Sequence, residues 1–364
     1  MIDANSAARS APTSDGPGLP ANIVDALAYP ALAVTASRRI IAANTAARAL
    51  FDDDLAGKDF VRIMRHPHAL ECLSRVIRTG DAETISLELQ FTTRRTFELT
   101  AGRIAAPDET FFLVTLLDVS AEIDAERSRS TFVANVSHEL RSPLTTLAGA
   151  VETLQGPARD DPKAQDMFLG LMSAETARMS RLVGDLLSLA KLEAKEHVAP
   201  DGAVDIVRVI KSVVNSLAAS DTDYPNRVEI TAQPGMLPVS GSEDELTEVF
   251  QNLIENALKY STPATPVSVT ITQRPAMTPG AGGRAIILIE DQGEGMERKH
   301  LSRLTERFYR VDKGRSREMG GTGLGLAITK HILNRHRGRM AIDSTVGEGT
   351  RVKVILNIKQ AGFD

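Results

Sequence analysis

The 364-residue sequence has almost no cysteine, because Cys72 is the only one. A single cysteine excludes an intramolecular disulfide framework and a zinc site built from a cysteine cluster, and it fits a reducing compartment. The hydrophobic share of 42% and the charged share of 24% are ordinary for globular proteins. At this length we expect two or three domains, each with a core of its own.

The sequence also lacks long hydrophobic runs and basic runs, and its first residues do not show the basic, apolar and cleavage-site pattern of a secretory signal. Its longest apolar run, 111–117, is far shorter than the ~18 residues of a membrane helix and is typical of a buried strand. The net charge is −5, and the sequence has no basic cluster of the kind that binds nucleic acid. We therefore expect a cytoplasmic chain with no membrane span and no nucleic-acid partner, any attachment to the inner membrane being made through partner proteins.

The N-terminal third divides into a tail and a small domain. Residues 1–20 are rich in Ala, Ser, Pro and Gly, which predicts a disordered tail. Within 21–120, short helices alternate with apolar strands, the last three expected at 84–91, 96–104 and 111–119. This order, with Ala43-Asn44 after the second strand and Asp118-Val119-Ser120 at the exit, resembles a PAS sensor domain, an α/β fold.

Two features of this domain raise the question of a bound cofactor. His66 and His68 flank Pro67 and could ligate a haem, and Cys72 could serve a flavin photosensor. We prefer loop histidines and a packed cysteine, because such histidines are far more common than haem ligands and Cys72 lies in an apolar helical context.

The middle of the chain, 121–197, predicts two long amphipathic helices. Apolar residues recur at steps of three and four from 132 to 154, within a helix expected at 121–155, and again from 168 to about 193. Gly156-Pro157 ends the first helix, and Asp161-Pro162 supplies the N-cap and first position of the second. An antiparallel helical hairpin leaves an apolar face uncovered, so we expect a homodimer that forms a four-helix bundle.

A histidine lies off the apolar stripe of the first helix. His138 and Glu139 should face solvent or a partner, and Pro143 should bend one continuous helix rather than begin a new one capped by Ser142. A neutral imidazole can act as a nucleophile near pH 7, and a carboxylate beside it can accept the Nδ1 proton. Adjacent side chains diverge on a helix, so Glu139 would have to reach sideways.

The remainder, 204–360, predicts an α/β sandwich with a polar row on its central helix. Ser242 and Glu245 form an expected capping box, and Asn252, Asn256 and Lys259 follow at i, i+4 and i+7. Amide oxygens that ligate Mg²⁺, with a lysine against phosphate, would explain this row. A solvated polar face is the alternative.

Two glycine-containing segments complete the pattern. In Asp291-Gln292-Gly293-Glu294-Gly295 a carboxylate at a strand end can accept from the N6 amine of adenine, while the glycines allow close backbone approach. The run 320–326 opens a helix, and its exposed N–H groups form a phosphate cradle. Alone, this run could equally be a tight turn.

The ordered set of 138–143, Asn252 with Asn256, 291–295, Phe308 and 321–325 resembles the H, N, G1, F and G2 boxes of a sensor histidine kinase over about 125–360. Segments 152–161 and 178–192 look most like phosphate-regulon sensor kinases. The resemblance implies that ATP phosphorylates His138, that Glu139 is its base, and that the phosphoryl group passes to an aspartate of a response regulator. Ser142, four residues after the histidine, would support a phosphatase reaction on that regulator.

The resemblance also implies a nucleotide site. Asn256 would hold Mg²⁺ with support from Asn252, Lys259 and Arg310 would meet phosphates, Asp291 would read adenine, and 308–325 would form a flexible lid. The full expected set is Asn252, Asn256, Lys259, Tyr260, Asp291, Gly293, Gly295, Phe308, Arg310, Gly321, Thr322, Gly323, Leu324 and Gly325. The family is typically membrane-anchored, so the signal would arrive here in the cytoplasm or through an upstream sensory protein.

Two other classes compete with this interpretation. An ATPase of the gyrase and chaperone type shares the nucleotide fold, but it activates water with a carboxylate where this chain has Asn252. A non-catalytic scaffold that binds ATP or a regulator is the other alternative. The presence of every candidate catalytic residue counts against it.

Overall fold

The computed structural model describes residues 19–51, 54–91, 93–105, 110–194, 198–217, 224–263, 265–275, 282–312, 314 and 321–359. The predicted disordered tail therefore lies outside the described residues, except that Leu19 and Pro20 begin a helix. The chain separates into two compact units, Met1–Thr131 and Phe132–Asp364.

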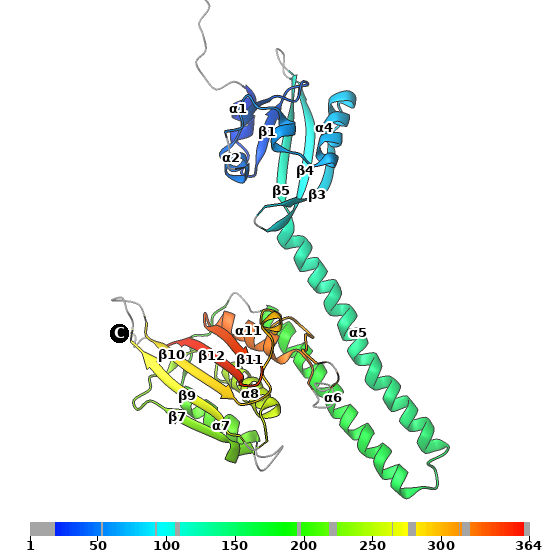
Figure 1. Cartoon of the computed structure of the whole chain (residues 1–364), viewed down its shortest axis with the longest axis vertical. Coiled ribbons are helices and arrows are strands. Elements are labelled where there is room, and N and C mark those ends of the chain that lie inside the picture. The colour runs from blue at the N-terminus through cyan, green and yellow to red at the C-terminus, as the bar shows by residue number, and fades with distance from the viewer. Residues whose placement is uncertain are drawn as a thin grey trace, which may run out of the picture. The chain divides into compact units, whose positions relative to one another are not determined.

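The first unit contains a five-stranded antiparallel sheet in the order β2-β1-β5-β4-β3 (Figure 1). The three long strands predicted from the sequence are present, each within one or two residues of its expected bounds. Helices α1 and α3 were not predicted. The elements are α1 Leu19–Asp25, β1 Ala31–Val34, β2 Ile40–Ala43, α2 Thr45–Phe51, α3 Phe60–Ile63, α4 Pro67–Thr79, β3 Glu83–Gln90, β4 Arg94–Ala105 and β5 Thr110–Asp118.

Side chains on both faces of this sheet are buried. Phe60 and Leu73 belong to the cluster that includes α4, and Val24 of α1 packs with Phe111 in a second cluster. Cys72 is fully buried in the first cluster, and burial raises the pKa of its thiol to about 11, as expected for a packing residue. Asn44 joins the first strand to the helix after the second, because its side-chain oxygen accepts from the backbone of Ala31 and of Ala47.

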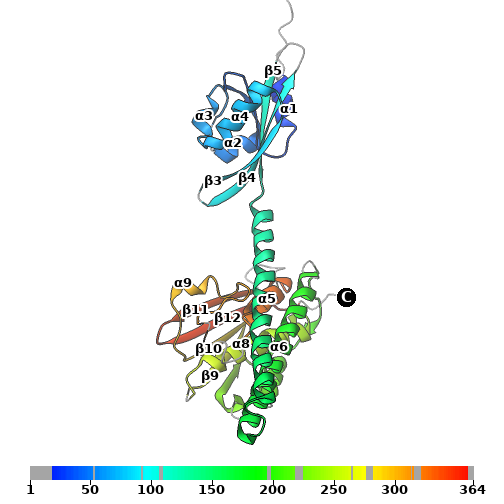
Figure 2. The same cartoon turned by 90° about the vertical axis from the view of Figure 1, so that its right-hand side faces the viewer.

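The second unit includes most of a long helical hairpin, α5 Ser120–Gln155 and α6 Pro162–Ala194, whose helices lie side by side in both views (Figures 1 and 2). Pro143 lies inside α5, so the prediction of one continuous helix is confirmed. The predicted start of α6 is confirmed too, since Asp161 Oδ1 accepts from the backbone of Lys163 and Ala164.

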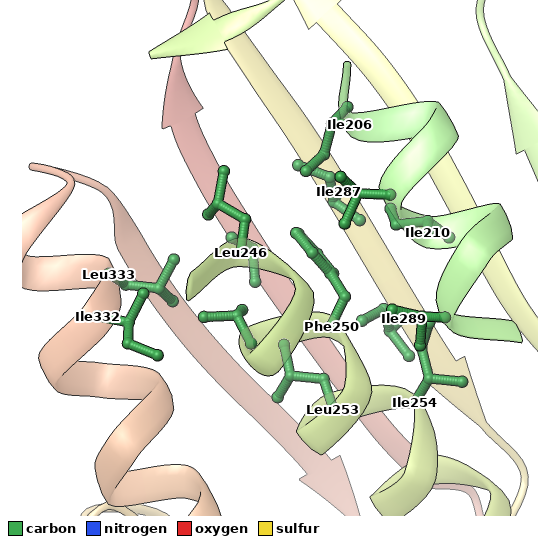
Figure 3. Close-up of a cluster of buried hydrophobic side chains, with 14 of the residues drawn as sticks. Ile206, Ile210, Leu246, Phe250, Leu253, Ile254, Ile287, Ile289, Ile332 and Leu333 are labelled. Atoms are coloured by element: carbon green, nitrogen blue, oxygen red, sulfur yellow. The ribbon is translucent and has the colours of Figure 1, made fainter. Parts of the chain in front are cut away.

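The rest of this unit is the expected α/β sandwich. Its sheet has the order β11-β12-β10-β9-β7, with only the β7–β9 pair parallel. Apolar side chains of α7, α8, β10 and α11 form its core (Figure 3). The elements are β6 Ala203–Val204, α7 Ile206–Leu217, η1 Tyr224–Arg227, β7 Val228–Ala232, β8 Val239–Ser240, α8 Glu243–Tyr260, β9 Val267–Arg274, β10 Arg284–Asp291, α9 Arg298–Leu301, α11 Gly325–Arg335, β11 Arg339–Thr345 and β12 Gly349–Asn357.

The predicted capping box at the start of α8 is wrong. The Ser242 side chain makes no cap hydrogen bond, and Glu245 pairs with Arg335 of α11. The Ser242 backbone N–H donates to Nε2 of the buried His336 at 3.0 Å, while His336 Nδ1 lies 2.8 Å from the carbonyl of Ile332. A carbonyl can only accept, so the imidazole is neutral with its proton on Nδ1. Burial is the main cause that lowers the pKa of His336.

Two cations bind the segment that joins α6 to the sandwich. Arg335 Nε donates to the carbonyl of Val198 at 2.8 Å, and Lys359 Nζ donates to the carbonyl of Asp201 at 2.6 Å. These residues come before position 204, where the sequence predicts that the domain begins. In the described part of the chain no helix is both long enough and apolar enough to cross a membrane.

Candidate functional site

A cavity of about 530 Å³ lies beside α8, and it collects most of the predicted nucleotide residues. Its volume is in the usual range for a small-molecule site. Of the predicted set, the residues that line it are Asn252, Asn256, Lys259, Tyr260, Asp291, Gly295, Arg310, Gly321, Thr322, Gly323 and Gly325. Residues separated by more than seventy positions in the sequence therefore meet in one cavity.

Helix α8 contributes a polar edge to this cavity. Asn252, Asn256 and Lys259 lie on one face of the helix, while Phe250, Leu253 and Ile254 on the other face are buried in the core (Figure 3). The Lys259 ammonium lies 2.6 Å from Glu255. The helix is thus held by its apolar face and presents two amide groups and one cation to the cavity.

Asp291 ends strand β10 and also lines the cavity. Its Oδ1 accepts from the backbone N–H of Gly293 at 2.9 Å and from that of Thr350 at 3.2 Å. These bonds fix the orientation of the carboxylate, and burial raises its pKa. Glycine is required nearby, because a Cβ on Gly293 would lie 2.2 Å from the carbonyl oxygen of Tyr260.

The two ends of the predicted lid are joined at their base. Phe308 has a positive φ of 64°, and its N–H donates to the carbonyl of Gly323 at 2.8 Å. Gly323 has φ +74°, and a Cβ there would lie 3.0 Å from the Cα of Phe308. A non-glycine residue in the left-handed region costs energy that its surroundings must offset. The lid residues 313 and 315–320 lie outside the described residues.

The glycine-rich run leads directly into α11, as predicted. A Cβ on Gly325 would lie 3.0 Å from Oδ1 of Asn252, so the first residue of the helix approaches the α8 amide closely. The donors at this helix N-terminus favour an anion, and the cavity is open to them. An anionic group of a small-molecule ligand fits these donors.

Three residues of the predicted nucleotide set do not line the cavity. Gly293 acts through its backbone, which orients Asp291. Leu324 is fully buried in the hydrophobic core, at the N-cap of α11. Phe308 packs against Phe132 of α5, with ring centroids 5.8 Å apart.

The phosphoacceptor candidate His138 is exposed on α5, as expected. Glu139 does not face solvent, because its carboxylate lies 2.6 Å from Arg178 of α6 and 3.8 Å from Arg310. Arg178 is buried and also pairs with Glu175 at 3.0 Å. Ser142, one turn after His138, is half-buried. The Glu139 carboxylate is therefore directed at α6, whereas its predicted role as a base requires it to reach His138.

Sequence reasoning missed two residues of α6 that line the cavity, Arg181 and Asp185. Thr322 Oγ1 donates to Asp185 Oδ2 at 2.6 Å across 137 positions of sequence. Burial raises the pKa of Asp185, and the Thr322 hydrogen bond opposes that rise. On a predicted amphipathic helix these residues belong to the polar face, and no local signal separates them from solvated neighbours.

With this geometry, the second unit is defined as an ATPase-type nucleotide domain joined to a phosphoacceptor hairpin. Residues 241–360 match the family described as "Histidine kinase-, DNA gyrase B-, and HSP90-like ATPase". Residues 128–195 match the His Kinase A (phospho-acceptor) domain. The chain therefore belongs to the sensor histidine kinases, and domains for ATP-dependent histidine phosphorylation are present.

Two curated relatives agree with this assignment. The sensor protein kinase WalK of Staphylococcus aureus is 38% identical over 253 residues, which are 68% of this chain and 58% of that protein. The phosphate regulon sensor protein PhoR of Pseudomonas aeruginosa is 41% identical over 238 residues, 65% of this chain and 52% of that protein. The chain thus spans between half and three fifths of their length. A solved structure of histidine kinase ThkA, in complex with response regulator protein TrrA, matches 93% of this chain and 98% of its own at 17% identity and a TM-score of 0.48.

Proposed function

We propose that this chain is a kinase that phosphorylates its own His138 from ATP and then passes the phosphoryl group to an aspartate of a response regulator. The observation that carries the proposal is the cavity, which brings the α8 amides, Asp291 and the glycine-rich run together in the same unit as an exposed histidine on a helical hairpin. Positioning and charge stabilisation are what phosphoryl transfer mainly requires.

In the proposed reaction, the neutral Nε2 of His138 attacks the γ-phosphorus of ATP. The bond from that phosphorus to the β–γ bridging oxygen breaks, and ADP leaves. Glu139 would accept the Nδ1 proton of His138, which requires its carboxylate to turn away from Arg178 and Arg310. An exposed imidazole at the surface of α5 is accessible both to a nucleotide domain and to a regulator.

The residues fit a nucleotide with magnesium. Asn256 would hold the metal, with Asn252 beside it, because amide and phosphate oxygens are ligands that Mg²⁺ prefers. In the described ranges, no three acidic, histidine or cysteine side chains come together in a metal-binding geometry. Most ligands of the Mg²⁺ ion would therefore be oxygens of the triphosphate. Lys259 and Arg310 would neutralise phosphate charge, Tyr260 would flank the nucleotide, and Asp291 would accept from the adenine amine.

The hairpin also supports a homodimer. Five apolar side chains on α5 and α6 remain more than half exposed: Val133, Leu144, Met167, Leu169 and Leu187. Pairing with the hairpin of a second copy would cover such residues in a four-helix bundle. His138 would remain at the bundle surface, where the regulator docks.

Finer aspects of the proposal depend on resemblance. The similarity to PhoR supports a role in phosphate-starvation signalling, and the N-terminal α/β domain would act as a PAS-type sensor of a cytoplasmic ligand or protein. Ser142 retains a hydroxyl one turn after His138, which supports dephosphorylation of the same regulator. The expected cytoplasmic location belongs to this proposal as well.

Incubation with γ-labelled ATP and Mg²⁺ tests the reaction. We expect acid-labile, alkali-stable label on the wild type and none on His138→Ala. Asn256→Ala should lose Mg²⁺-dependent nucleotide binding while the protein stays dimeric. Label that survives His138→Ala would remove the histidine from the mechanism, and nucleotide binding without any label would indicate the scaffold alternative.

A mixture of two inactive variants identifies the route of transfer. If one subunit phosphorylates the other, a mixture of His138→Ala and Asn256→Ala chains regains label on the Asn256→Ala chain. If transfer occurs within a subunit, the mixture stays unlabelled. Separation of the two chains by a size tag shows which one carries the phosphoryl group.

A further inference from the structure

A carboxylate from the helical hairpin occupies the edge of the nucleotide cavity. Asp185 of α6 lines the cavity and accepts a hydrogen bond from the hydroxyl of Thr322 at 2.6 Å. Thr322 lies in the glycine-rich run whose donors would receive the triphosphate, and its Oγ1 also accepts from the backbone of Leu324 at 3.3 Å. The hairpin thus places a carboxylate where a phosphate of the proposed ligand would bind.

A second carboxylate contacts a cation of the same cavity. Arg310 lines the cavity, its side chain is only 6% exposed, and it lies 3.8 Å from Glu139 of α5. Arg178 lies 2.6 Å from the same carboxylate. Glu139, the candidate base for His138, therefore lies between two guanidinium groups, one from α6 and one from the nucleotide site.

The remaining contacts hold the hairpin against both ends of the lid. Phe132 of α5 packs on Phe308, and the guanidinium of Arg307 lies 5.2 Å from the centroid of the Phe132 ring. Arg307 also pairs with Glu193 of α6. The residues that contact the hairpin thus include Arg307, Phe308 and Arg310 around the start of the lid and Thr322 near its end.

The electrostatics of this contact are unfavourable to a bound triphosphate. Asp185 and Glu248 are both more than half removed from solvent, and burial is the main cause that raises the pKa of each. Each accepts from one hydroxyl across the contact, Asp185 from Thr322 and Glu248 from Ser188. Both line the cavity, so a nucleotide bound there with several negative charges would experience repulsion at low dielectric.

We propose that Asp185 and Glu139 are internal competitors of the nucleotide: they hold Thr322 and Arg310 in place of the triphosphate, so that ATP binding and this contact with the hairpin exclude each other. The inference rests on the proposed function, since the same cavity must take a nucleoside triphosphate. Phosphates that bind Arg310 would remove one of the two guanidinium groups that hold Glu139, and only the contact with Arg178 would then keep this base from His138.

Competition predicts the opposite result from a metal role for Asp185. If Asp185 were a ligand of the bound Mg²⁺, its loss would weaken nucleotide binding. If it competes with the phosphates, its loss strengthens binding, because the arrangement that accepts the triphosphate is more populated. Adenosine has no phosphates and should bind equally well in both arrangements.

The test uses the full chain and calorimetric titration with the Mg²⁺ complex of a non-hydrolysable ATP analogue, and with adenosine. Asp185→Asn keeps an oxygen acceptor for Thr322 but removes the charge. We expect roughly 10-fold tighter binding of the triphosphate analogue and unchanged binding of adenosine. Asp166→Asn is the matched control, because Asp166 is exposed on the same helix and does not line the cavity. It should leave both affinities unchanged.

Three outcomes would overturn the competition: weaker analogue binding, unchanged analogue binding, or an equal gain for the analogue and adenosine. The labelling experiment on His138 is independent of these results. If the wild type labels His138 but Asp185→Asn gains no affinity, the competition fails and the kinase function stands. If no label forms but Asp185→Asn still tightens triphosphate binding, the kinase function fails and the competition stands.

A spectroscopic reporter measures the contact itself. The chain contains no tryptophan, so Phe132→Trp introduces a single indole beside Phe308. The Mg²⁺–analogue complex should shift its emission to the red, because the indole would leave Phe308 and meet water, whereas adenosine should not. An emission spectrum that saturating triphosphate analogue leaves unchanged would contradict mutual exclusion.

Discussion

Acidification should destabilise the nucleotide domain through His336. This imidazole is only 4% exposed, and its neutral Nε2 accepts the Ser242 N–H at the start of α8, the helix that carries Asn252 and Asn256. Protonation would remove that acceptor and place a cation beside Arg335, although Glu245 at 3.8 Å would offset part of the cost. The Nδ1 proton is already committed to the Ile332 carbonyl.

The sign and size of the change in unfolding free energy follow from the lowered pKa of His336. His336 titrates at its ordinary value of 6.5 when unfolded and lower when folded. Its contribution to stability is therefore complete above about pH 6.5, and it is lost as the pH falls below that value toward the folded pKa. Between about pH 7.5 and about pH 5.5, a folded state that binds no proton would lose about 1.4 kcal/mol of unfolding free energy at this residue, and this is an upper limit.

Urea unfolding of the wild type and His336→Gln at both pH values isolates this residue. Glutamine offers an oxygen acceptor to Ser242 but does not titrate, so the other ionisable groups cancel in the difference. The wild type should lose up to about 1.4 kcal/mol more than the variant on acidification. An identical loss in both proteins, or a wild type that becomes more stable in acid, would refute a neutral buried imidazole at this position.

Three other substitutions test the site and its supports. Asp291→Asn should weaken ATP binding about 10- to 100-fold in calorimetry with little change in Tm, because the amide oxygen would accept from Gly293 and Thr350 and the N–H₂ group left toward adenine cannot accept; unchanged affinity would exclude the adenine role. Gly295→Ala places a Cβ 1.9 Å from the Thr345 carbonyl oxygen and should lower Tm far more than Gly347→Ala, whose cost is only the left-handed φ, about 1–2 kcal/mol; equal Tm values would contradict the clash. Arg178→Met leaves Glu139 and Glu175 without this shared cation and should cost about 3 kcal/mol in chemical unfolding, whereas a neutral result would mean that solvent screens both carboxylates.

Local patterns explain why much of the fold was predictable. The two hairpin helices, the strands β3 to β5 and the polar row on α8 each follow from a repeat of two or three to four residues within a short segment. Asp161 before Pro162 fixed the start of α6 for the same reason, since a cap and its donors are neighbours in sequence. These signals do not depend on where distant parts of the chain lie.

The incorrect or missing predictions in the second unit involve long-range partners. The Ser242 N–H was assigned to Glu245, three residues away, but His336, 94 positions later, accepts it. Leu324 was grouped with its glycine neighbours, but its side chain is part of the core. Asp185 and Arg181 have no sequence signal, because their importance arises only when α6 contacts the glycine-rich run. The roles of such residues depend on their burial and on contacts with distant parts of the chain, which residue type alone does not reveal.

The hydrogen bonds from Arg335 and Lys359 to the segment before position 204 determine where the nucleotide domain can be excised. A nucleotide domain excised at residue 204 would lose the Val198 and Asp201 carbonyls and leave two cations without those acceptors at its new N-terminus. Arg335 also pairs with Glu245 on the helix that bears the asparagines, so the damage would extend toward the ligand. Excision before Val198 avoids this, because both carbonyls then stay with the domain and continue to accept from Arg335 and Lys359.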